Sequence, residues 1–257
     1  VISLPAATVW ANEGWEWRFP TRILLAEQEI KREKRKYGNI SNPQFDSNRK
    51  NLLILGDSQA ADVFFAFQEA DGLVSRIREV SFRCNSFFEA DDKNDADTVE
   101  HCKKSFDDLL ASEDLRVADF LVYVHFWGKD NKAAYRTAVE RIRAVNGDIK
   151  IVVFGQRPVL GRKFVTINEI TKYHQDLDTL NEYLNSIAWI QRDANADARE
   201  MTEALGLIFV DVADVFCDGG CTYYRKPNFA YFDQNHWTNF GRKLFFEKFK
   251  RTEIYGK

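Results

Sequence analysis

Short apolar runs alternate along the chain with longer stretches in which apolar residues recur every three or four positions. The runs are short, rich in Val, Ile, Leu and Phe, and predict strands at 51–55, 77–82, 120–126, 149–154 and 207–212. The periodic stretches predict helices at 61–67, 99–110, 134–145 and, with breaks, 177–205. This order favours an α/β protein: a three-layer α/β/α fold with a mostly parallel five-stranded sheet.

The first fifty residues do not follow this alternation. Residues 1–20 carry several aromatic side chains among polar ones, which predicts an irregular segment that docks through its rings. Residues 22–37 show helical spacing and end in the basic run 31–36, which fits either a solvated helix face or a contact with anionic headgroups or glycan. We therefore expect a linker or extension, 1–50, that packs on a main domain, 51–257.

Composition narrows the classes of function. The 257 residues are 45% hydrophobic and 29% charged, which is ordinary for a globular domain large enough to bury one core. A net charge of −3 gives no support for nucleic-acid binding, since such proteins usually present a net basic face. No apolar run is long enough to cross a bilayer, and the chain begins at Val1 without Met, so we expect an excised or processed domain.

The four cysteines divide into two pairs by position. Cys217 and Cys221 flank a Gly-Gly turn, and Cys84 and Cys102 bracket an acidic stretch. Two disulfides would imply an oxidising compartment, whereas four reduced thiols would fit a cytosolic protein. A zinc site at the same corner is a further alternative, with Cys217, Cys221, Asp233 and His236 as its ligands. Its Cys-x3-Cys spacing is a loose match to zinc-binding patterns, so we expect no metal.

One serine follows the first predicted strand. Gly56, Asp57 and Ser58 separate the apolar run 51–55 from the predicted helix 61–67, so Ser58 lies at a strand-to-helix turn. At the carboxyl edge of a parallel sheet, a hydroxyl there is close to the unpaired N–H groups of the following helix, which can hold a developing oxyanion. The tripeptide also fits an ordinary capped turn, so a nucleophile needs further support from a base.

A base and its partner are found near the C-terminus. Asp233 and His236 stand three residues apart in a polar loop before a predicted last helix, 242–250. His236 would take the proton from Ser58, and Asp233 would orient the imidazole and stabilise its charged form. Three other histidines fit surface or buried structural positions better than the base: His101, His125 and His174.

The serine and histidine blocks resemble those of the SGNH, or GDSL-like, hydrolase and acyltransferase superfamily. The first block reads Gly56-Asp57-Ser58-Gln59-Ala60 and lacks the Gly-x-Ser-x-Gly elbow of α/β-hydrolases. With the second block, 231–241, it is similar to the C-terminal extracytoplasmic SGNH domain of membrane acyltransferase-3 proteins, which O-acetylate cell-surface polysaccharides. The resemblance covers residues 51–249 and implies the flavodoxin-like SGNH-hydrolase fold.

The resemblance also implies a function. The chain would be an O-acetyltransferase domain with Ser58, Asp233 and His236 as its catalytic residues. With no cofactor bound, it would receive an acetyl group from a donor, acetyl-CoA, through an N-terminal transmembrane acyltransferase domain outside this chain. The acceptor would be a hydroxyl of a surface polysaccharide such as lipopolysaccharide O-antigen. We therefore expect a periplasmic domain of a bacterial inner-membrane protein.

Two oxyanion donors of the usual SGNH pattern are missing from their places. Neither the block after the second strand nor the one after the third, where the superfamily has Gly and Gly-x-Asn-Asp, is intact. The backbone N–H of Ser58 should still donate, and Asn85 is a second donor by position. Because each donor contributes about 3 kcal/mol in hydrolases, this loss favours transfer over water-driven cleavage. Four residues would contact a sugar acceptor or simply pack: Trp127, Gln156, Arg157 and Trp237.

Two other functions stay open. The same three residues would serve a carbohydrate or lipid O-acetyl esterase in which water accepts the acyl group. Alternatively, they would hold loops together in a non-catalytic glycan-binding module. Acetate release without an acceptor would indicate the esterase, and glycan binding unaffected by changes at Ser58 and His236 would indicate the module.

Overall fold

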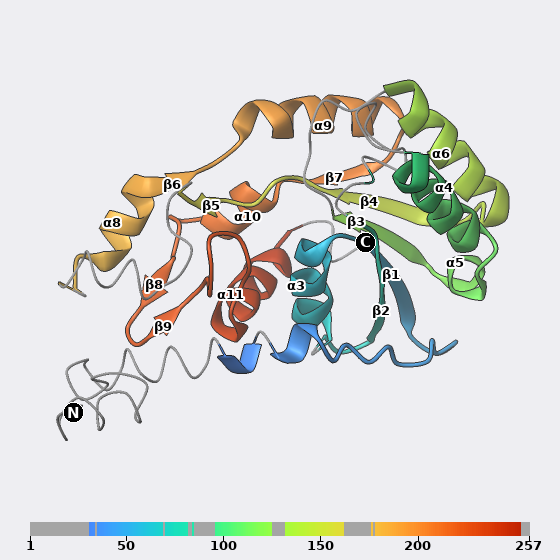
Figure 1. Ribbon diagram of the computed structural model, residues 1–257. Coiled ribbons are helices and arrows are strands. Elements are labelled where there is room, and N and C mark those ends of the chain that lie inside the picture. The colour runs from blue at the N-terminus through green and yellow to red at the C-terminus, as the bar shows by residue number, and fades with distance from the viewer. Residues whose placement is uncertain are drawn as a thin grey trace, which may run out of the picture.

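The computed structural model describes residues 31–33, 35–68, 70–81, 84, 96–124, 132–161, 176 and 178–252. A sheet of five parallel strands forms the centre, in the order β2-β1-β3-β4-β7 (Figure 1). The strands are β1 (Lys50–Gly56), β2 (Leu73–Glu79), β3 (Phe120–Val124), β4 (Lys150–Phe154) and β7 (Ile208–Val210). The predicted α/β class with a parallel five-stranded sheet is confirmed.

Two strands depart from their predicted positions. β2 begins before residue 77 and ends before residue 82, the predicted limits of this strand. Arg76 and Arg78 interrupt its apolar residues, so the sequence shows no continuous apolar run that marks its true limits. It is an edge strand, which tolerates such residues. The last strand stops at Val210 because Asp211 caps a helix that the sequence did not predict, accepting hydrogen bonds from the N–H groups of Ala213 and Asp214.

Helices cover both faces of the sheet (Figure 1). On one face pack α3 (Ser58–Phe67), α8 (Leu180–Ile187), α10 (Val212–Cys217) and α11 (Asn239–Phe249). On the other pack α4 (Ala96–Leu110), α5 (Glu113–Val117), α6 (Lys132–Val145) and α9 (Arg192–Ala204). Two short antiparallel pairs were not predicted: β5 (Val159–Leu160) with β6 (Ala188–Trp189), and β8 (Tyr224–Arg225) with β9 (Asn228–Phe229).

The central strand β1 connects the two hydrophobic cores. Leu52 and Ile54 belong to the core that includes α3 and α11, whereas Leu53 and Leu55 belong to the core that includes α4 and α6. This division follows from the alternation of side chains in a strand, and all four are buried. Because β1 is packed on both faces, the turn that follows it is held in one position at the carboxyl edge of the sheet.

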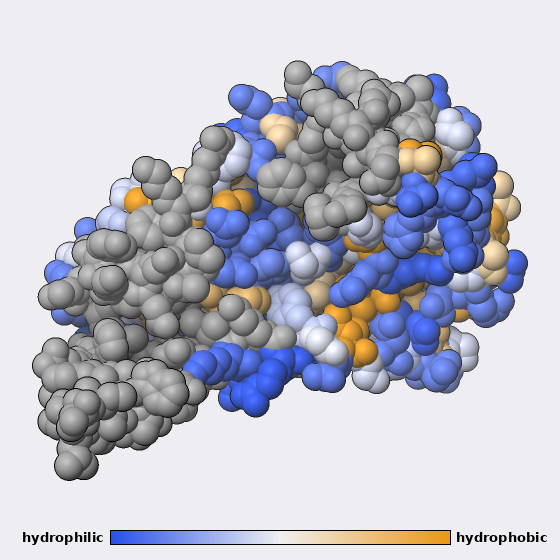
Figure 2. Space-filling view, in the orientation of Figure 1, coloured by the Kyte–Doolittle hydropathy of each residue, from blue (hydrophilic) through white to orange (hydrophobic). Residues whose placement is uncertain are grey.

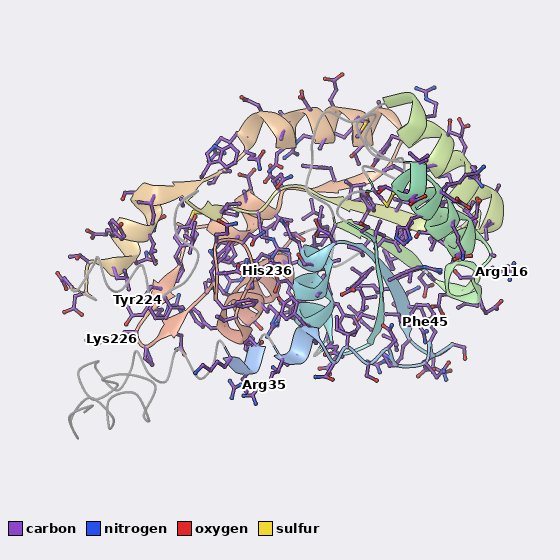
Figure 3. All side chains as sticks on the ribbon, in the orientation of Figure 1. Arg35, Phe45, Arg116, Tyr224, Lys226 and His236 are labelled. Carbon is purple, nitrogen blue, oxygen red and sulfur yellow. A yellow bond between two sulfur atoms is a disulfide. The ribbon has the colours of Figure 1, made fainter. Side chains whose placement is uncertain are left out.

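Part of the predicted extension packs on the sheet domain. Residues 31–33 and 35–37 are helical; Glu33 is fully buried, while Arg32, Arg35 and Lys36 are exposed. These basic side chains contribute to a strongly hydrophilic surface beside α3, near Arg35 as labelled (Figures 2 and 3). The aromatic segment 1–20 lies outside the described residues, and the division at residue 50 stays a prediction.

Both cysteine pairs are disulfides, Cys84–Cys102 and Cys217–Cys221, which confirms the prediction. The sulfurs of Cys217 and Cys221 are bonded to each other and are therefore not the free thiolates that the zinc alternative requires. Among the residues that the structure describes, no group of three acidic, His or Cys side chains could hold a metal ion. No helix in the same part of the chain is long and apolar enough to cross a membrane.

Candidate active site

Ser58 is the first residue of α3 and its side chain is exposed. The helix starts three residues before its predicted beginning because Asp57 caps it, accepting a hydrogen bond from the N–H of Gln59 at 2.8 Å. A β-carbon at Gly56 would lie 1.7 Å from the carbonyl oxygen of Val124, so the end of β1 has room only for glycine. The turn thus holds Ser58 at the carboxyl edge of the sheet.

His236 lies in a tight loop between β9 and α11. An antiparallel bridge between Tyr231 and Trp237 closes the loop. Inside it, one oxygen of Asp233 accepts hydrogen bonds from the N–H groups of Asn235 at 3.0 Å and His236 at 2.8 Å. This local turn places the aspartate beside the imidazole three residues later.

The loop and the serine turn meet in a hydrogen-bonded chain. His236 Nε2 is 2.8 Å from Ser58 Oγ, and His236 Nδ1 is 2.8 Å from Asp233 Oδ2. An ionised carboxylate only accepts hydrogen bonds, so Nδ1 carries the proton and Nε2 is left to accept the Ser58 hydroxyl. In Figure 3, His236 lies between α11 and α3. This arrangement can move a proton from the serine to the imidazole.

The charges around the imidazole favour its protonated form. Burial alone would lower the pKa of His236, but the hydrogen bond to Asp233 and the negative charges of Asp62 and Asp233 raise it above its ordinary value. Burial would raise the pKa of Asp233, but its bonds to His236 and to the backbone bring it below its ordinary value. The pair is therefore suited to hold a transferred proton on the ring.

Two aromatic rings hold the imidazole in place. Phe232 stacks on His236 with 13° between the planes and 5.5 Å between the centroids. Tyr37, from the segment before β1, meets the same ring edge-on at 5.8 Å. The His236 side chain remains 18% exposed, so the site is open on the side of Ser58.

The structure describes three of the four residues that were predicted either to contact a sugar acceptor or to pack. Gln156, Arg157 and Trp237 are at most 1% exposed, so none offers its side chain to a sugar at the surface of this structure. Arg157 is paired with Asp62 and lies 4.1 Å over the Trp237 ring, so the Arg157 and Trp237 side chains pack against each other inside the structure. Trp127 and the predicted oxyanion donor Asn85 lie outside the described residues.

Asp62 and Tyr37 are the neighbours of the site that the sequence did not predict. Asp62 is fully buried one helical turn after Ser58, and its carboxylate accepts a hydrogen bond from the Tyr37 hydroxyl. A signal for Asp62 existed, because it is the one charged residue in helix α3, whose other residues from Ala60 to Phe67 are apolar, and a buried charge must be paired. No comparable signal marks Tyr37.

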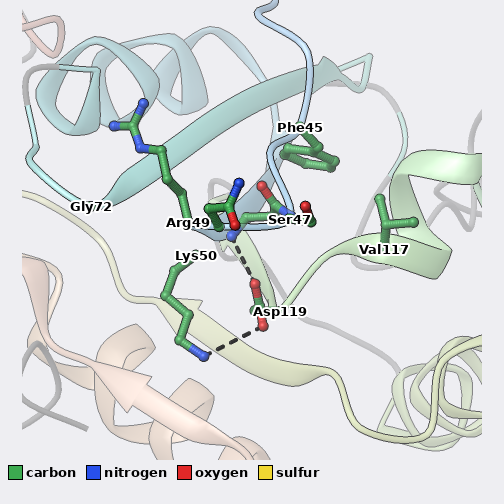
Figure 4. A pocket seen from close by; sticks show the side chains of 9 residues that line it. Phe45, Ser47, Arg49, Lys50, Gly72, Val117 and Asp119 are labelled. Atoms are coloured by element: carbon green, nitrogen blue, oxygen red, sulfur yellow. Dashed lines mark hydrogen bonds and ion pairs between the residues drawn. The ribbon is translucent and has the colours of Figure 1, made fainter.

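A separate hollow lies at the opposite edge of the sheet (Figure 4). Its volume is about 660 Å3, and its lining includes Lys50 at the start of β1 and Asp119 just before β3. The amine of Lys50 is 3.6 Å from the carboxylate of Asp119, which also accepts a bond from the N–H of Asn51. None of the predicted site residues lines it.

The comparison with protein families shows which family the chain belongs to. A model described as the SGNH domain fused to AT3 domains matches residues 27–251. The chain belongs to this SGNH family. The match includes both blocks of the SGNH domain, those of Ser58 and of His236, and part of the segment before β1.

Solved structures resemble this SGNH domain in fold. The periplasmic domain of the lipopolysaccharide acetyltransferase of Salmonella ser. Paratyphi A matches with a TM-score of 0.62 and 13% identity, covering 89% of this chain and 97% of that one. An acetyl-xylooligosaccharide esterase mutant from Geobacillus matches with a TM-score of 0.42 and 12% identity, over 79% of this chain and 93% of that one. No curated protein matches the SGNH domain in sequence.

Proposed function

We propose that this SGNH domain is an O-acetyltransferase that carries an acetyl group on Ser58 and passes it to a hydroxyl of a bacterial cell-surface polysaccharide, such as lipopolysaccharide O-antigen. The observation that carries the proposal is the exposed Ser58 hydroxyl, 2.8 Å from an imidazole that is itself bonded to a carboxylate. The fusion to AT3 domains that describes the family supports a donor delivered through a membrane domain.

In the first half-reaction, Ser58 Oγ attacks the carbonyl carbon of the donor's acetyl group. The hydroxyl proton moves to His236 Nε2, and Asp233 stabilises the imidazolium through its bond to Nδ1. The carbonyl oxygen becomes an oxyanion near the start of α3, where the backbone N–H of Ser58 is one donor. When the bond to the leaving group breaks, that group takes the proton from Nε2 and acetyl-Ser58 remains.

In the second half-reaction, after the leaving group has departed, a polysaccharide hydroxyl is the nucleophile. Its oxygen attacks the carbonyl carbon of acetyl-Ser58 while neutral Nε2 accepts its proton. The bond from carbon to Ser58 Oγ then breaks, and His236 returns the proton to the serine. One acetyl group has moved from donor to acceptor, and the three residues are restored.

The setting of this reaction belongs to the same proposal. The original donor is acetyl-CoA, the acetyl group crosses the bilayer through an N-terminal transmembrane acyltransferase domain, and this chain works in the periplasm. Two disulfides support an oxidising compartment. Asn85 remains our choice for the second oxyanion donor, and Trp127 for an acceptor contact.

The proposal is tested by trapping the serine. Phenylmethylsulfonyl fluoride should add one sulfonyl group to Ser58 with loss of fluoride, and intact mass should show a single adduct. Ser58→Ala and His236→Ala should show none. Ser112→Ala is the matched control, because Ser112 also lies at a helix start but caps it, bonded to the N–H of Leu115. That variant should label like the parent.

The fate of an acetyl group separates the alternatives. With p-nitrophenyl acetate as donor, a transferase should form acetyl-Ser58 that is discharged faster when an O-antigen polysaccharide is added. Release of free acetate at the same rate with and without the polysaccharide would instead identify an esterase. Labelling that persists in Ser58→Ala would overturn the assignment of the nucleophile, and glycan binding without any adduct would identify a binding module.

A further inference from the structure

A second polar cluster lies buried directly beside the serine and histidine. Its centre is an ion pair between Asp62 of α3, which is fully buried, and Arg157, which follows β4 and is 1% exposed. Burying two charges is costly unless their geometry and further hydrogen bonds compensate, and an apolar pair of similar volume is often no less stable. Stability alone therefore does not explain why a buried ion pair lies beside the site.

The guanidinium of Arg157 touches both halves of the site. Its Nη2 donates to the carbonyl oxygen of Gln59 at 2.8 Å, and Gln59 is the residue after Ser58. Its Nη1 donates to the carbonyl oxygen of Asn235 at 3.2 Å, and Asn235 is the residue before His236. One rigid, planar group thus spans the serine turn and the histidine loop.

Asp62 completes the connection from the other side. Its two carboxylate oxygens each lie 3.1 Å from the N–H of Trp237, the residue after His236. The carboxylate also accepts the Tyr37 hydroxyl and the Nη1 group of Arg157. All of these partners are donors, which favours the ionised carboxylate, whereas burial raises the pKa of Asp62 above its ordinary value.

We propose that the Asp62–Arg157 ion pair sets the distance between Ser58 and His236 by tying the backbone on both sides of the histidine to the start of α3. Ser58 and His236 are 178 positions apart in sequence, and the Arg157 side chain bonds to the backbone of both loops. Asp62 and Arg157 are thus positioning residues. The proposal rests on the proposed function, because it concerns the same serine and histidine.

The charged and aromatic groups that surround His236 determine how each variant should change its pKa and its position. They are Asp233 in its own loop, Asp62 on α3, Arg157 after β4 and the Tyr37 ring from the preceding segment. Asp62→Asn removes a negative charge that raises the pKa of His236 and leaves the positive charge of Arg157, which lowers it. Arg157→Lys keeps the charges but loses the planar fork. The first variant should therefore change titration and placement, the second only placement.

The test measures placement and titration separately. The ring signals of the four histidines are followed by NMR against pH, with His236→Ala identifying the signal of interest. The rate of Ser58 labelling by phenylmethylsulfonyl fluoride is measured on the same proteins. We expect Asp62→Asn to lower the pKa of His236 and to slow labelling about tenfold or more, and Arg157→Lys to slow labelling similarly with little change in that pKa.

Glu33→Gln is the matched control. Glu33 is also fully buried and paired with an arginine, Arg242, but the Arg242 guanidinium lies over the Phe65 ring of α3. It should lower Tm and leave labelling at the parental rate. Parental labelling in folded Arg157→Lys or in folded Asp62→Asn would overturn the proposal. Should Asp62→Asn fail to fold, Tyr37→Phe, which removes only one donor to Asp62, must still slow labelling for the proposal to stand.

The readouts also separate this proposal from the proposed function. If the parent chain takes no sulfonyl group, the nucleophile assignment fails, while the His236 titration in Asp62→Asn still reports whether Asp62 acts on the imidazole. If the parent labels and the variants match it in both readouts, the serine is activated without help from the ion pair.

Discussion

One carboxylate oxygen of Asp233 accepts hydrogen bonds from the backbone N–H groups of Asn235 and His236 and also lies 3.0 Å from the imidazole. The spacing of three residues makes this possible, because a short turn brings the backbone of the fourth residue back to the side chain of the first. The Asp-x-x-His block therefore carries its own local geometry. This is why two of the three proposed catalytic residues could be predicted as a pair.

The raised pKa of His236 sets the pH dependence of labelling. Only the neutral ring accepts the Ser58 proton, so the labelling rate should rise with pH through a midpoint above the ordinary value of 6.5 and then level off. Asp233→Asn removes the carboxylate that raises this pKa, so the midpoint should fall. The plateau should drop about a hundredfold or more, because the imidazolium loses its partner. Rates of sulfonyl fluoride labelling across the pH range measure both effects, and a midpoint that stays in place in Asp233→Asn would contradict them.

The same shifts predict the sign of two contributions to stability. A raised pKa means that the folded state binds the His236 proton more tightly, so this contribution is complete below the ordinary pKa and is lost as pH rises through the folded pKa. The lowered pKa of Asp233 acts in the opposite range: its contribution is present above its ordinary value of 3.8 and is lost as pH falls through the folded pKa.

At the scale of elements, the junction between β1 and α3 depends on the packing of β1 against β3. Gly56 is paired with Val124 in the sheet, and the approach of the Val124 carbonyl leaves no space for a side chain. The following residue, Asp57, caps the helix and fixes its first turn. Strand, glycine, cap and helix together determine where Ser58 stands, so a change in any of them should move the hydroxyl.

Gly56→Ala should therefore damage both fold and site. The added β-carbon would force β1 away from β3, which should destabilise the protein by about 3 kcal/mol or more and, for a domain of this size, lower Tm by about 6–12 °C. Labelling of Ser58 should slow as well, because the turn shifts. Thermal unfolding and intact mass measure the two effects.

Gly147→Ala is the control for this substitution. The nearest atom to a β-carbon there is the carbonyl oxygen of Arg143, at an ordinary contact distance of 3.8 Å. Its Tm should stay within a few degrees of the parent or rise slightly, because alanine reduces the entropy of the unfolded chain. Equal Tm values for the two alanine variants would show that the junction is less tightly packed than the structure indicates.

At the scale of the whole molecule, the segment before β1 is joined to the sheet domain by buried polar contacts. Glu33 pairs with Arg242 of α11, and Tyr37 bonds to Asp62 of α3. Phe65 of α3 lies between them, under the Arg242 guanidinium and against the Tyr37 ring. The segment thus contributes to the core beside the site as well as preceding it in the chain.

Removal of this segment should destabilise the protein more than removal of the residues that precede the segment. A chain of residues 51–257 leaves Arg242 buried without Glu33, and breaking such a pair costs about 3–5 kcal/mol. A chain of residues 27–257 keeps the contact and is the matched comparison. We expect the shorter chain to melt at a clearly lower temperature or fail to fold, as measured by circular dichroism. Coincident melting curves would mean that the sheet domain is complete from residue 51.

The sequence by itself determined those features that depend on neighbouring residues. The apolar runs predicted the strands β1, β3 and β4, because strands buried on both faces need continuous apolar residues. Ser58, Asp233 and His236 were predicted because each lies in a short block with its own turn geometry. The shift of β2 and the two-residue strands were not predictable in this way, since polar residues interrupt the first and no periodicity can develop over two positions.

Only the tertiary structure decided which distant side chains meet. Asp62 contacts residues 25, 95 and 175 positions away, and Arg157 contacts residues 98 and 78 positions away, so no local pattern encodes these partners. The sequence left two roles open for Arg157, contact with a sugar acceptor and packing. Burial favours packing, because a charge inside the core must be paired, and the fold supplies Asp62 as its partner.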